Sequence, residues 1–207
     1  MALKNRLIKK LIHTPFILNF GQNFLGANQY KLELYQQALV GKHGALLDFG
    51  CSYGNTTPGF LNFEYHGIDI DEVAIGFAKR KYQAYPNVNF HCLDILKQEF
   101  KRNYFDHVLF ASTGHHLSDE EFRKILEVLL IHLKPAGELH YFDIFQKPND
   151  TWTTKLLTRF DQGKYIRTRE QSAAFFKNYP VAEMRILPSP EKLVKLWDFM
   201  YVKITRP

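Results

Sequence analysis

The chain has 207 residues, enough for one full α/β domain and too few for two of ordinary size. Hydrophobic residues make up 45% and charged residues 23%, without repeats or low-complexity tracts, which excludes a disordered or a repeat protein. The formal net charge is +6, but the basic residues occur in scattered pairs such as Lys9-Lys10 and Arg80-Lys81. A nucleic-acid-binding surface gathers its charge into one patch, so this distribution favours a solvated basic surface and no nucleic-acid partner.

The two cysteines, Cys51 and Cys92, lie within or beside apolar runs, where thiols usually behave as small buried hydrophobes. The sequence has no CxxC motif and no Cys/His cluster with zinc-like spacing. We therefore expect neither a disulfide framework nor a structural metal, and the reduced cytoplasm is the expected compartment.

Residues 1–43 are predicted to form an N-terminal helical segment, a lid or a packing extension. The apolar residues from Leu3 to Ile12 fall on one helical face, with basic residues between them. These charges and the lack of an A-x-A site argue against a signal peptide, and the apolar run is too short to span a bilayer. A helix packed on the domain is the favoured interpretation; peripheral membrane contact through residues 1–20 is the alternative. A second helix is predicted from Gln29 to Val40.

From residue 44 the chain alternates between strand-like and helix-like patterns. The predicted strands span residues 45–49, 65–70, 88–92, 104–111, 138–144, 181–187 and 196–205. The predicted helices are a short one after Thr57-Pro58 and others at 72–82, 118–132, 152–160 and 170–177. Ser118 and Glu121 have the spacing of a capping box, and the helix at 72–82 is expected to turn Val73, Ile75, Phe77 and Ala78 inward.

This alternation predicts a mostly parallel sheet with helices on both faces, in one domain over residues 44–207. Ligands of such sheets bind at the carboxyl ends of the strands, beside the point where the strand order reverses. The segments that follow the predicted strands are therefore where the functional residues are expected.

The first strand ends in a turn with the pattern D-x-G-x-S-x-G, formed by Asp48, Gly50, Ser52 and Gly54 and the residues between them. Small residues at 50, 52 and 54 allow the backbone to turn sharply and to approach a ligand. A dinucleotide-binding turn reads G-x-G-x-x-G and places a pyrophosphate on the next helix. An acidic residue before the glycines would repel phosphate, but it suits a cationic amino-acid group.

The pattern resembles the first motif, [DE]-x-G-x-G-x-G, of class I S-adenosylmethionine-dependent methyltransferases, with Ser52 in place of the middle glycine. Four further segments resemble the family's later motifs in the same order, and together the five span about residues 44–145. They are Gly67-Ile-Asp69-Ile-Asp71, Phe90-His-Cys-Leu-Asp94-Ile95, Phe105 to Ala111, and Leu133-Lys-Pro-Ala-Gly137. The resemblance implies a Rossmann-like, doubly wound, seven-stranded sheet with S-adenosyl-L-methionine as cofactor and S-adenosyl-L-homocysteine as product.

The resemblance also implies the residues that hold the cofactor. Asp69 would accept hydrogen bonds from both ribose hydroxyls, and Asp94 would accept one from the adenine amino group. The other expected cofactor-binding residues are Asp48, Gly50, Cys51, Ser52, Gly54, Ile70, Ile95, Ala111 and Ser112.

Residues 112–116 follow the fourth strand of the motif region, where the family faces its substrate. Methyl transfer depends on holding the acceptor in line with the sulfonium, and a general base helps when the acceptor carries a proton. His115 and His116 are the ionisable candidates, as a base or as a scaffold, with His115 favoured for substrate contact and His116 for architecture. Further substrate-pocket candidates are Tyr141, Asp143 and Tyr165; for Tyr165 the alternative is one more buried aromatic.

Motifs that are missing narrow the chemistry. Ala111-Ser112 stands where metal-assisted O-methyltransferases hold a cation with carboxylates, so no catalytic metal is expected. The same position lacks the D/N-P-P-Y/F motif of amino-directed nucleic-acid enzymes and the cysteine of the covalent cytosine route. A metal-independent, small-molecule methyltransferase is therefore the leading hypothesis, with O-methylation slightly favoured. The alternatives are an RNA or protein methyltransferase, and a membrane-associated cofactor-binding protein without methyl transfer.

Overall fold

The computed structural model describes residues 27–98, 100–148, 150, 164–188 and 198–207. The described residues divide into a smaller unit, residues 27–42 and 55–60, and a larger unit, residues 43–54 and the described residues from 61 onward. Within the described part of the smaller unit, the helix α3 (Ala27–Ala38) contacts the 3-10 helix η1 (Thr57–Phe60). The predicted helix from Gln29 to Val40 is therefore present, and the short helix after Thr57 has the 3-10 form.

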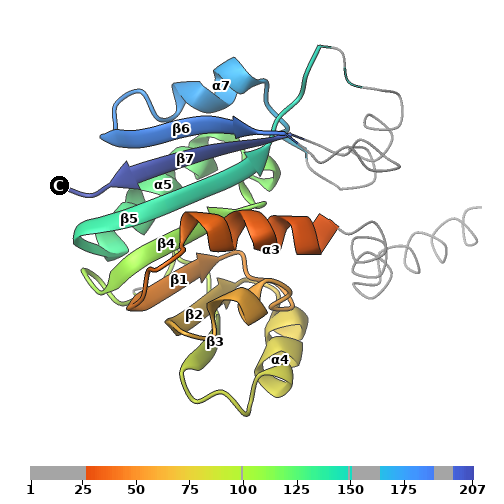
Figure 1. The fold of residues 1–207 in the computed structure, drawn as a ribbon, viewed down its shortest axis with the longest axis vertical. Helices are drawn as coiled ribbons and strands as arrows, with labels where there is room; N and C mark the ends of the chain where they lie inside the picture. Colours follow the sequence, from red (N-terminus) through yellow and green to blue (C-terminus); the bar gives the residue numbers. More distant parts are fainter. Residues whose placement is uncertain (1–26, 99, 149, 151–163, 189–197) are drawn as a thin grey trace, which may run out of the picture. The chain divides into compact units, whose positions relative to one another are not determined.

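The larger unit contains a seven-stranded sheet with the strand order β3-β2-β1-β4-β5-β7-β6 (Figure 1). Strand β7 runs antiparallel to both of its neighbours, and the other pairs are parallel. The strands are β1 (Ala45–Phe49), β2 (Glu64–Asp69), β3 (Val88–Cys92), β4 (Phe105–Ala111), β5 (Leu133–Ile144), β6 (Val181–Leu187) and β7 (Phe199–Thr205). The predicted Rossmann-like, mostly parallel, seven-stranded sheet is confirmed.

One face of the sheet packs against helix α5 (Asp119–His132). Because side chains alternate along a strand, every second residue points to this face, and Leu47, Val108 and Leu139 join Ile125 and Leu129 of the helix in one apolar core. The predicted capping box opens the helix: the Ser118 hydroxyl accepts the Glu121 N–H, and the Glu121 carboxylate accepts the Ser118 N–H. The last described helix, α7 (Arg169–Ala174), is capped in the same way by Thr168 and Gln171.

Helix α4 (Glu72–Lys81) lies beside β2 and β3 (Figure 1) and buries Ala74, Ile75 and Ala78. The predicted inward orientation of Val73 and Phe77 is wrong, since these side chains are 70% and 45% exposed. Residues 74, 75 and 78 share one side of a helix with 3.6 residues per turn, and this leaves 73 and 77 together on another side.

Several predicted boundaries are shifted in the structure, and the shifts of β5 and α7 are among the larger ones. Strand β5 begins at Leu133, which pairs with Phe105 of β4 before the register shifts and resumes at Glu138, whereas the sequence predicts a start at Glu138. Helix α7 ends at Ala174, short of the predicted Lys177. The helices predicted near residues 1–20 and 152–160 lie outside the described residues. Among the described residues, no helix has the length and apolarity needed to cross a membrane.

The strand order reverses between β1 and β4. From β1 the chain crosses to β2 and β3 on one side, and it then returns to β4 and β5 on the other side. The connections after β1 and β4 therefore leave the sheet in opposite directions at their shared carboxyl edge, which is the usual ligand position in this architecture.

Candidate functional site

The turn after β1 has an unusual backbone. Gly50, Ser52 and Gly54 all have positive φ angles, of 78°, 49° and 67°. A Cβ atom at position 50 would lie 2.3 Å from the Thr113 Oγ1 atom in the connection after β4, so only glycine fits there. The Gly50 and Cys51 N–H groups both donate to the Ile68 carbonyl, which fixes the turn against the end of β2. The two segments that flank the reversal point thus meet at position 50.

The carboxylate of Asp69 joins the end of β2 to this turn. Its Oδ2 accepts the Ser52 N–H at 2.9 Å, and its Oδ1 accepts the Asp71 N–H at 3.0 Å. Asp71 in turn caps helix α4 by accepting the Val73 and Ala74 N–H groups. The side chain of Ile70, between the two acids, is 74% exposed. The end of β2 therefore presents an oriented carboxylate beside an exposed apolar side chain.

Asp48 lies beneath the turn and is buried. Its Oδ2 accepts a hydrogen bond from the Tyr65 hydroxyl at 2.6 Å. Burial raises the pKa of Asp48 to about 6, the hydrogen bond from Tyr65 opposes this rise, and the negative charge of Asp69 adds to it. Burial also holds the pKa of the Cys51 thiol well above its usual range, so Cys51 is a packing residue and not a nucleophile. The turn thus covers a carboxylate that a nearby cation would stabilise in its charged form.

Asp94 follows β3 at the same edge of the sheet. Its carboxylate accepts the Leu96 N–H at 3.0 Å and pairs with Lys97 at 2.8 Å; the hydrogen bond from Lys97 is the largest cause of a lowered pKa. The neighbouring Ile95 is buried in the core. The topology therefore places Asp48, Asp69 and Asp94 at the ends of three adjacent parallel strands, β1, β2 and β3.

The connection after β4 carries the two histidines. Ala111 is buried, and Ser112 has a φ of 51° and donates its N–H to the Phe142 carbonyl. His115 is only 4% exposed: its backbone N–H donates to Asp143 Oδ2 at 2.8 Å, and its Nδ1 lies 2.5 Å from Asp143 Oδ1. His116 is exposed, with its ring centroid 4.1 Å from that of His115. The sequence favoured His115 for substrate contact and His116 for architecture. In the structure His116 is the exposed side chain and His115 the buried one.

The three predicted pocket residues occupy different environments. Asp143 and Tyr141 are 1% and 3% exposed, and the Asp143 carboxylate also accepts the Ile144 N–H and a 3.4 Å hydrogen bond from the Tyr141 hydroxyl. They support the His115 loop from beneath and do not line an open surface. Tyr165 is 42% exposed and donates its N–H to the His115 carbonyl, so the alternative of a buried aromatic at 165 is wrong.

Arg167 is a site residue to which the sequence assigned no role, although the segment 161–167 resembles one found in small methyltransferases of this superfamily. It is buried, and its guanidinium donates to the carbonyls of Gly114 at 3.0 Å and Leu117 at 2.7 Å and to the carboxylate of Asp119 at 2.9 Å. It also stacks over the rings of Phe122 and Phe175. An isolated arginine in a polar segment gives no sequence signal for this role, which depends on the folded path of two distant segments.

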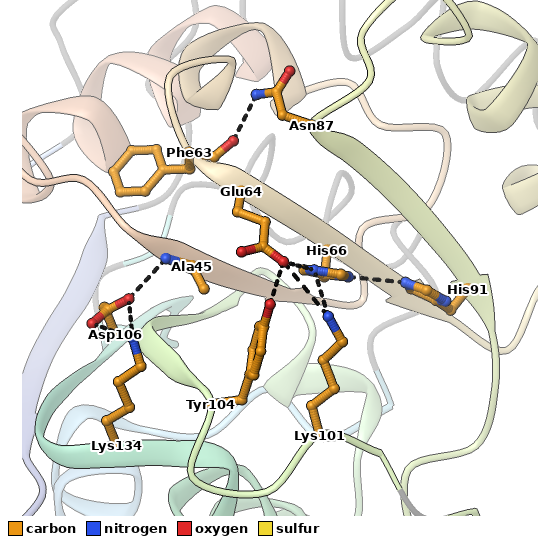
Figure 2. A network of polar contacts seen from close by, with 10 residues as sticks. All are labelled: Ala45, Phe63, Glu64, His66, Asn87, His91, Lys101, Tyr104, Asp106 and Lys134. Atoms are coloured by element: carbon orange, nitrogen blue, oxygen red, sulfur yellow. Dashed lines mark hydrogen bonds and ion pairs between the residues drawn. The ribbon is translucent and has the colours of Figure 1, made fainter.

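A second polar cluster lies at the opposite, amino-terminal edge of the sheet (Figure 2). Glu64 contacts the Tyr104 hydroxyl, His66 and Lys101, while Lys134 pairs with Asp106 at 2.9 Å. Beside these groups is an open cavity of about 380 Å³, lined by Gly44, Ala45, Asn62, Glu64, Tyr104, Asp106 and Lys134. Each of the two carboxylates already meets a cation, and ligands of parallel sheets bind at the other edge, so we assign this cluster to stability.

Comparisons with known proteins bear on the family and the fold of the chain. Residues 46–137 match a family model described as a methyltransferase domain. This part of the chain is therefore similar to a methyltransferase domain. The resemblance to class I S-adenosylmethionine-dependent methyltransferases, inferred from the five motifs, is confirmed by this match. No curated protein matches the sequence.

Solved structures resemble this chain in fold at low identity. Phosphoethanolamine N-methyltransferase 2 from Haemonchus contortus, bound to phosphomonomethylethanolamine and S-adenosylhomocysteine, has a TM-score of 0.66 and 14% identity over 88% of this chain and 52% of its own. The N-methyltransferase NodS from Bradyrhizobium japonicum has a TM-score of 0.62 and 17% identity over 87% and 94%.

A C-methyltransferase has the same fold. Geranyl diphosphate C-methyltransferase from Streptomyces coelicolor, bound to Mg²⁺, geranyl diphosphate and S-adenosylhomocysteine, has a TM-score of 0.66 and 12% identity over 86% of this chain and 80% of its own. The chain spans about half the length of the Haemonchus enzyme.

Proposed function

We propose that the chain transfers the methyl group of S-adenosyl-L-methionine to a small-molecule acceptor, without a metal ion in the transfer step. The observation that carries this proposal is the placement of Asp48, Asp69 and Asp94 at three adjacent strand ends around a left-handed, glycine-containing turn. Two neighbours of the same fold were solved with S-adenosylhomocysteine, which supports the choice of cofactor.

Each part of the cofactor has a matching group in this arrangement. Two backbone N–H groups fix the Asp69 carboxylate, whose remaining lone pairs would accept the ribose hydroxyls. Ile70 would lose its exposed surface against one face of the adenine, and Asp94 would accept the adenine amino group. The turn of Gly50, Cys51, Ser52 and Gly54 would follow the amino-acid portion.

The electrostatics beneath that turn fit a cationic ligand. Asp48 is buried and close enough to Asp69 for the two negative charges to raise its pKa. A positive sulfonium or ammonium group bound above the turn would stabilise the charged form of Asp48, because opposite charges attract strongly in a low-dielectric site. The methylated cofactor carries a sulfonium charge and its product does not.

On the acceptor side, we assign the substrate contact to His116 and a positioning role to His115. His116 is exposed on the connection after β4, and its ring contacts the ring of the buried His115, which pairs with Asp143. A histidine titrates near neutral pH, so His116 would remove the proton that an oxygen or nitrogen acceptor loses during transfer. The preference for oxygen stays a prediction; the three neighbours described above are named as methyltransferases of nitrogen or carbon.

The cofactor proposal is tested by calorimetry with S-adenosylmethionine and S-adenosylhomocysteine. Both should bind the wild-type chain. Asp69→Asn should weaken both by at least about tenfold, because a neutral amide replaces a charged acceptor of ribose hydrogen bonds. Glu120→Gln is the matched control, since Glu120 is exposed on α5 and pairs only locally with Lys124 at 2.7 Å. Absence of heat with either compound would refute the proposal.

The transfer proposal is tested with a panel of amines, hydroxylated aromatics and prenyl diphosphates, measuring the formation of S-adenosylhomocysteine. With an accepted substrate that carries a transferable proton, His116→Ala should lower kcat by at least about a hundredfold and leave cofactor affinity unchanged. His116→Gln should stay equally impaired, because glutamine does not titrate. An unchanged kcat and pH profile would show that His116 is not the base.

A further inference from the structure

Three donor side chains converge on β4 and β5, away from the carboxyl edge. They are His107 on β4 and Glu138 and His140 on β5. His107 and Glu138 are direct partners in the parallel register, and His140 follows Glu138 by two residues. Since side chains alternate along a strand, residues 138 and 140 share one face of the sheet. Strand pairing alone therefore brings together residues that lie about thirty positions apart in sequence.

Two of the three distances among the donor atoms are close to those of a metal site. His107 Nδ1 lies 3.5 Å from Glu138 Oε2, His140 Nε2 lies 3.6 Å from the same oxygen, and all three atoms lie within 4.8 Å of one another. Good hydrogen bonds are shorter, at about 2.7–3.2 Å. Ligands of a tetrahedral zinc ion, with bonds of about 2.0–2.1 Å, lie about 3.3–3.4 Å apart. The two shorter separations are thus close to a tetrahedral edge.

The surroundings of the three residues orient the donors. The side chains of His107, Glu138 and His140 are 8%, 15% and 0% exposed. The second ring nitrogen of His140, Nδ1, lies 3.1 Å from the Tyr201 hydroxyl, the kind of outer contact that fixes the ring of a metal-bound histidine. Lys203 Nζ lies 3.9 Å from Glu138 Oε1, the oxygen that faces away from the histidines, and 3.8 Å from a Glu183 carboxylate oxygen. The positive charge of Lys203 is therefore divided between two carboxylates.

We infer that His107, Glu138 and His140 form a structural site for one first-row divalent cation, with Zn²⁺ as the preferred ion. Two imidazole nitrogens and one carboxylate oxygen are a donor set that such ions accept, and three protein ligands leave one position for water. The ion would join β4 to β5 in the middle of the sheet. It takes no part in methyl transfer: His107 lies four residues before Ala111, the last residue of β4, so the inference does not rest on the proposed function.

The test is a titration of the chelator-treated full chain with ZnCl₂ and, separately, with CoCl₂. Bound zinc is counted by mass spectrometry of the metal, and cobalt reports tetrahedral geometry through its visible absorption. One equivalent should bind per chain and raise the midpoint of thermal unfolding, because a ligand that binds only the folded state stabilises it. Glu138→Gln and His140→Gln should each weaken zinc binding by at least about tenfold.

Two controls separate this site from other donors. His132→Gln removes another buried histidine, on α5, and Cys92→Ser removes the exposed thiol; both variants should keep the full equivalent. Binding of S-adenosylhomocysteine and the far-UV circular dichroism report whether each variant folds. The inference is overturned if the wild-type chain binds no zinc or if a folded His140→Gln variant retains wild-type affinity; the cluster would then be an ion-pair group in which histidine protons balance Glu138.

Discussion

The two edges of the sheet use charge in opposite ways. At the amino edge, Glu64 lies within reach of Lys101 and Asp106 is paired with Lys134. At the carboxyl edge, Asp48 and Asp69 lie close enough for like charges to raise a pKa, and the turn between them has three residues with positive φ. Pairs of opposite charge stabilise the fold. Like charges and strained backbone lower its stability, and they are typical of functional sites, where a bound ligand can compensate for the loss.

The largest effect should come from breaking the buried hydrogen-bonded pair of His115 and Asp143. Asp143→Ala leaves the His115 ring and backbone N–H without their carboxylate and should cost about 3–5 kcal/mol of the free energy of unfolding. Urea unfolding measures the change. Glu120→Gln, at an exposed pair, should cost less than about 0.5 kcal/mol. A loss of similar size in both variants would show that the pair under the loop is not special.

The next effect should depend on pH. The pKa of Asp48 rises on folding from 3.8 to about 6, so its charged form opposes folding; this cost is absent below pH 3.8 and complete above pH 6. Asp48→Asn should therefore stabilise the chain by up to about 3 kcal/mol at pH 7.5 and by much less at pH 4. The same variant should bind S-adenosylmethionine more weakly. Greater stability of the wild type at pH 7.5 would contradict this account.

Strain in the turn after β1 should appear in a pair of glycine variants. Position 50 has a positive φ, and a Cβ atom there would clash with Thr113. Gly50→Ala should therefore lower the free energy of unfolding by about 1–3 kcal/mol and weaken cofactor binding. Gly76→Ala lies in helix α4, where the nearest atom to the new Cβ is 3.7 Å away, and it should stabilise the chain by about 0.5–1 kcal/mol. Thermal unfolding compares the stability of the two variants, and calorimetry compares their cofactor affinity. If both substitutions changed stability in the same direction, the strain would not be specific to the turn after β1.

The smallest effect is expected at the amino edge. Glu64→Gln removes the charge that contacts Lys101 and His66, and because Glu64 is half exposed it should cost roughly 1 kcal/mol or less. Contacts with His66 and Tyr104 lower the pKa of Glu64 to about 2, so this contribution is present above pH 4.5 and is lost as the pH falls toward 2. Cofactor affinity should not change; a loss of affinity would show that the two edges are coupled.

Local sequence patterns were sufficient for much of the fold. The spacing of apolar runs located β3 and β6 with their observed bounds, and Ser118 and Glu121 predicted the capping box that opens α5. These features depend on neighbours in the chain. The orientation of Val73 and Phe77 was wrong, because an apolar side chain does not show which side of a helix meets the sheet.

Features that depend on strand pairing were beyond the sequence. His115 was expected to face the substrate, but it is the buried histidine of the two, and His116 is exposed. Sequence could not distinguish these neighbours, because the difference arises from the contact of His115 with Asp143, 28 positions away. The hydrogen bond from Tyr65 to Asp48 and the convergence of His107 with Glu138 also require the register of neighbouring strands. The cofactor-binding roles of Asp69 and Asp94 follow from the resemblance alone and stay predictions.

Arg167 has a consequence for redesign of acceptor preference. Its guanidinium fastens the loop at residues 114–119 to the segment that leads into α7, so the loop's shape is encoded partly outside the loop. If residues 112–117 were replaced by those of another enzyme, the new loop would still be held by Arg167 of this chain. Chimaeras that exchange both segments together, with their own arginine, should fold and retain their donor's selectivity more often than single-loop grafts.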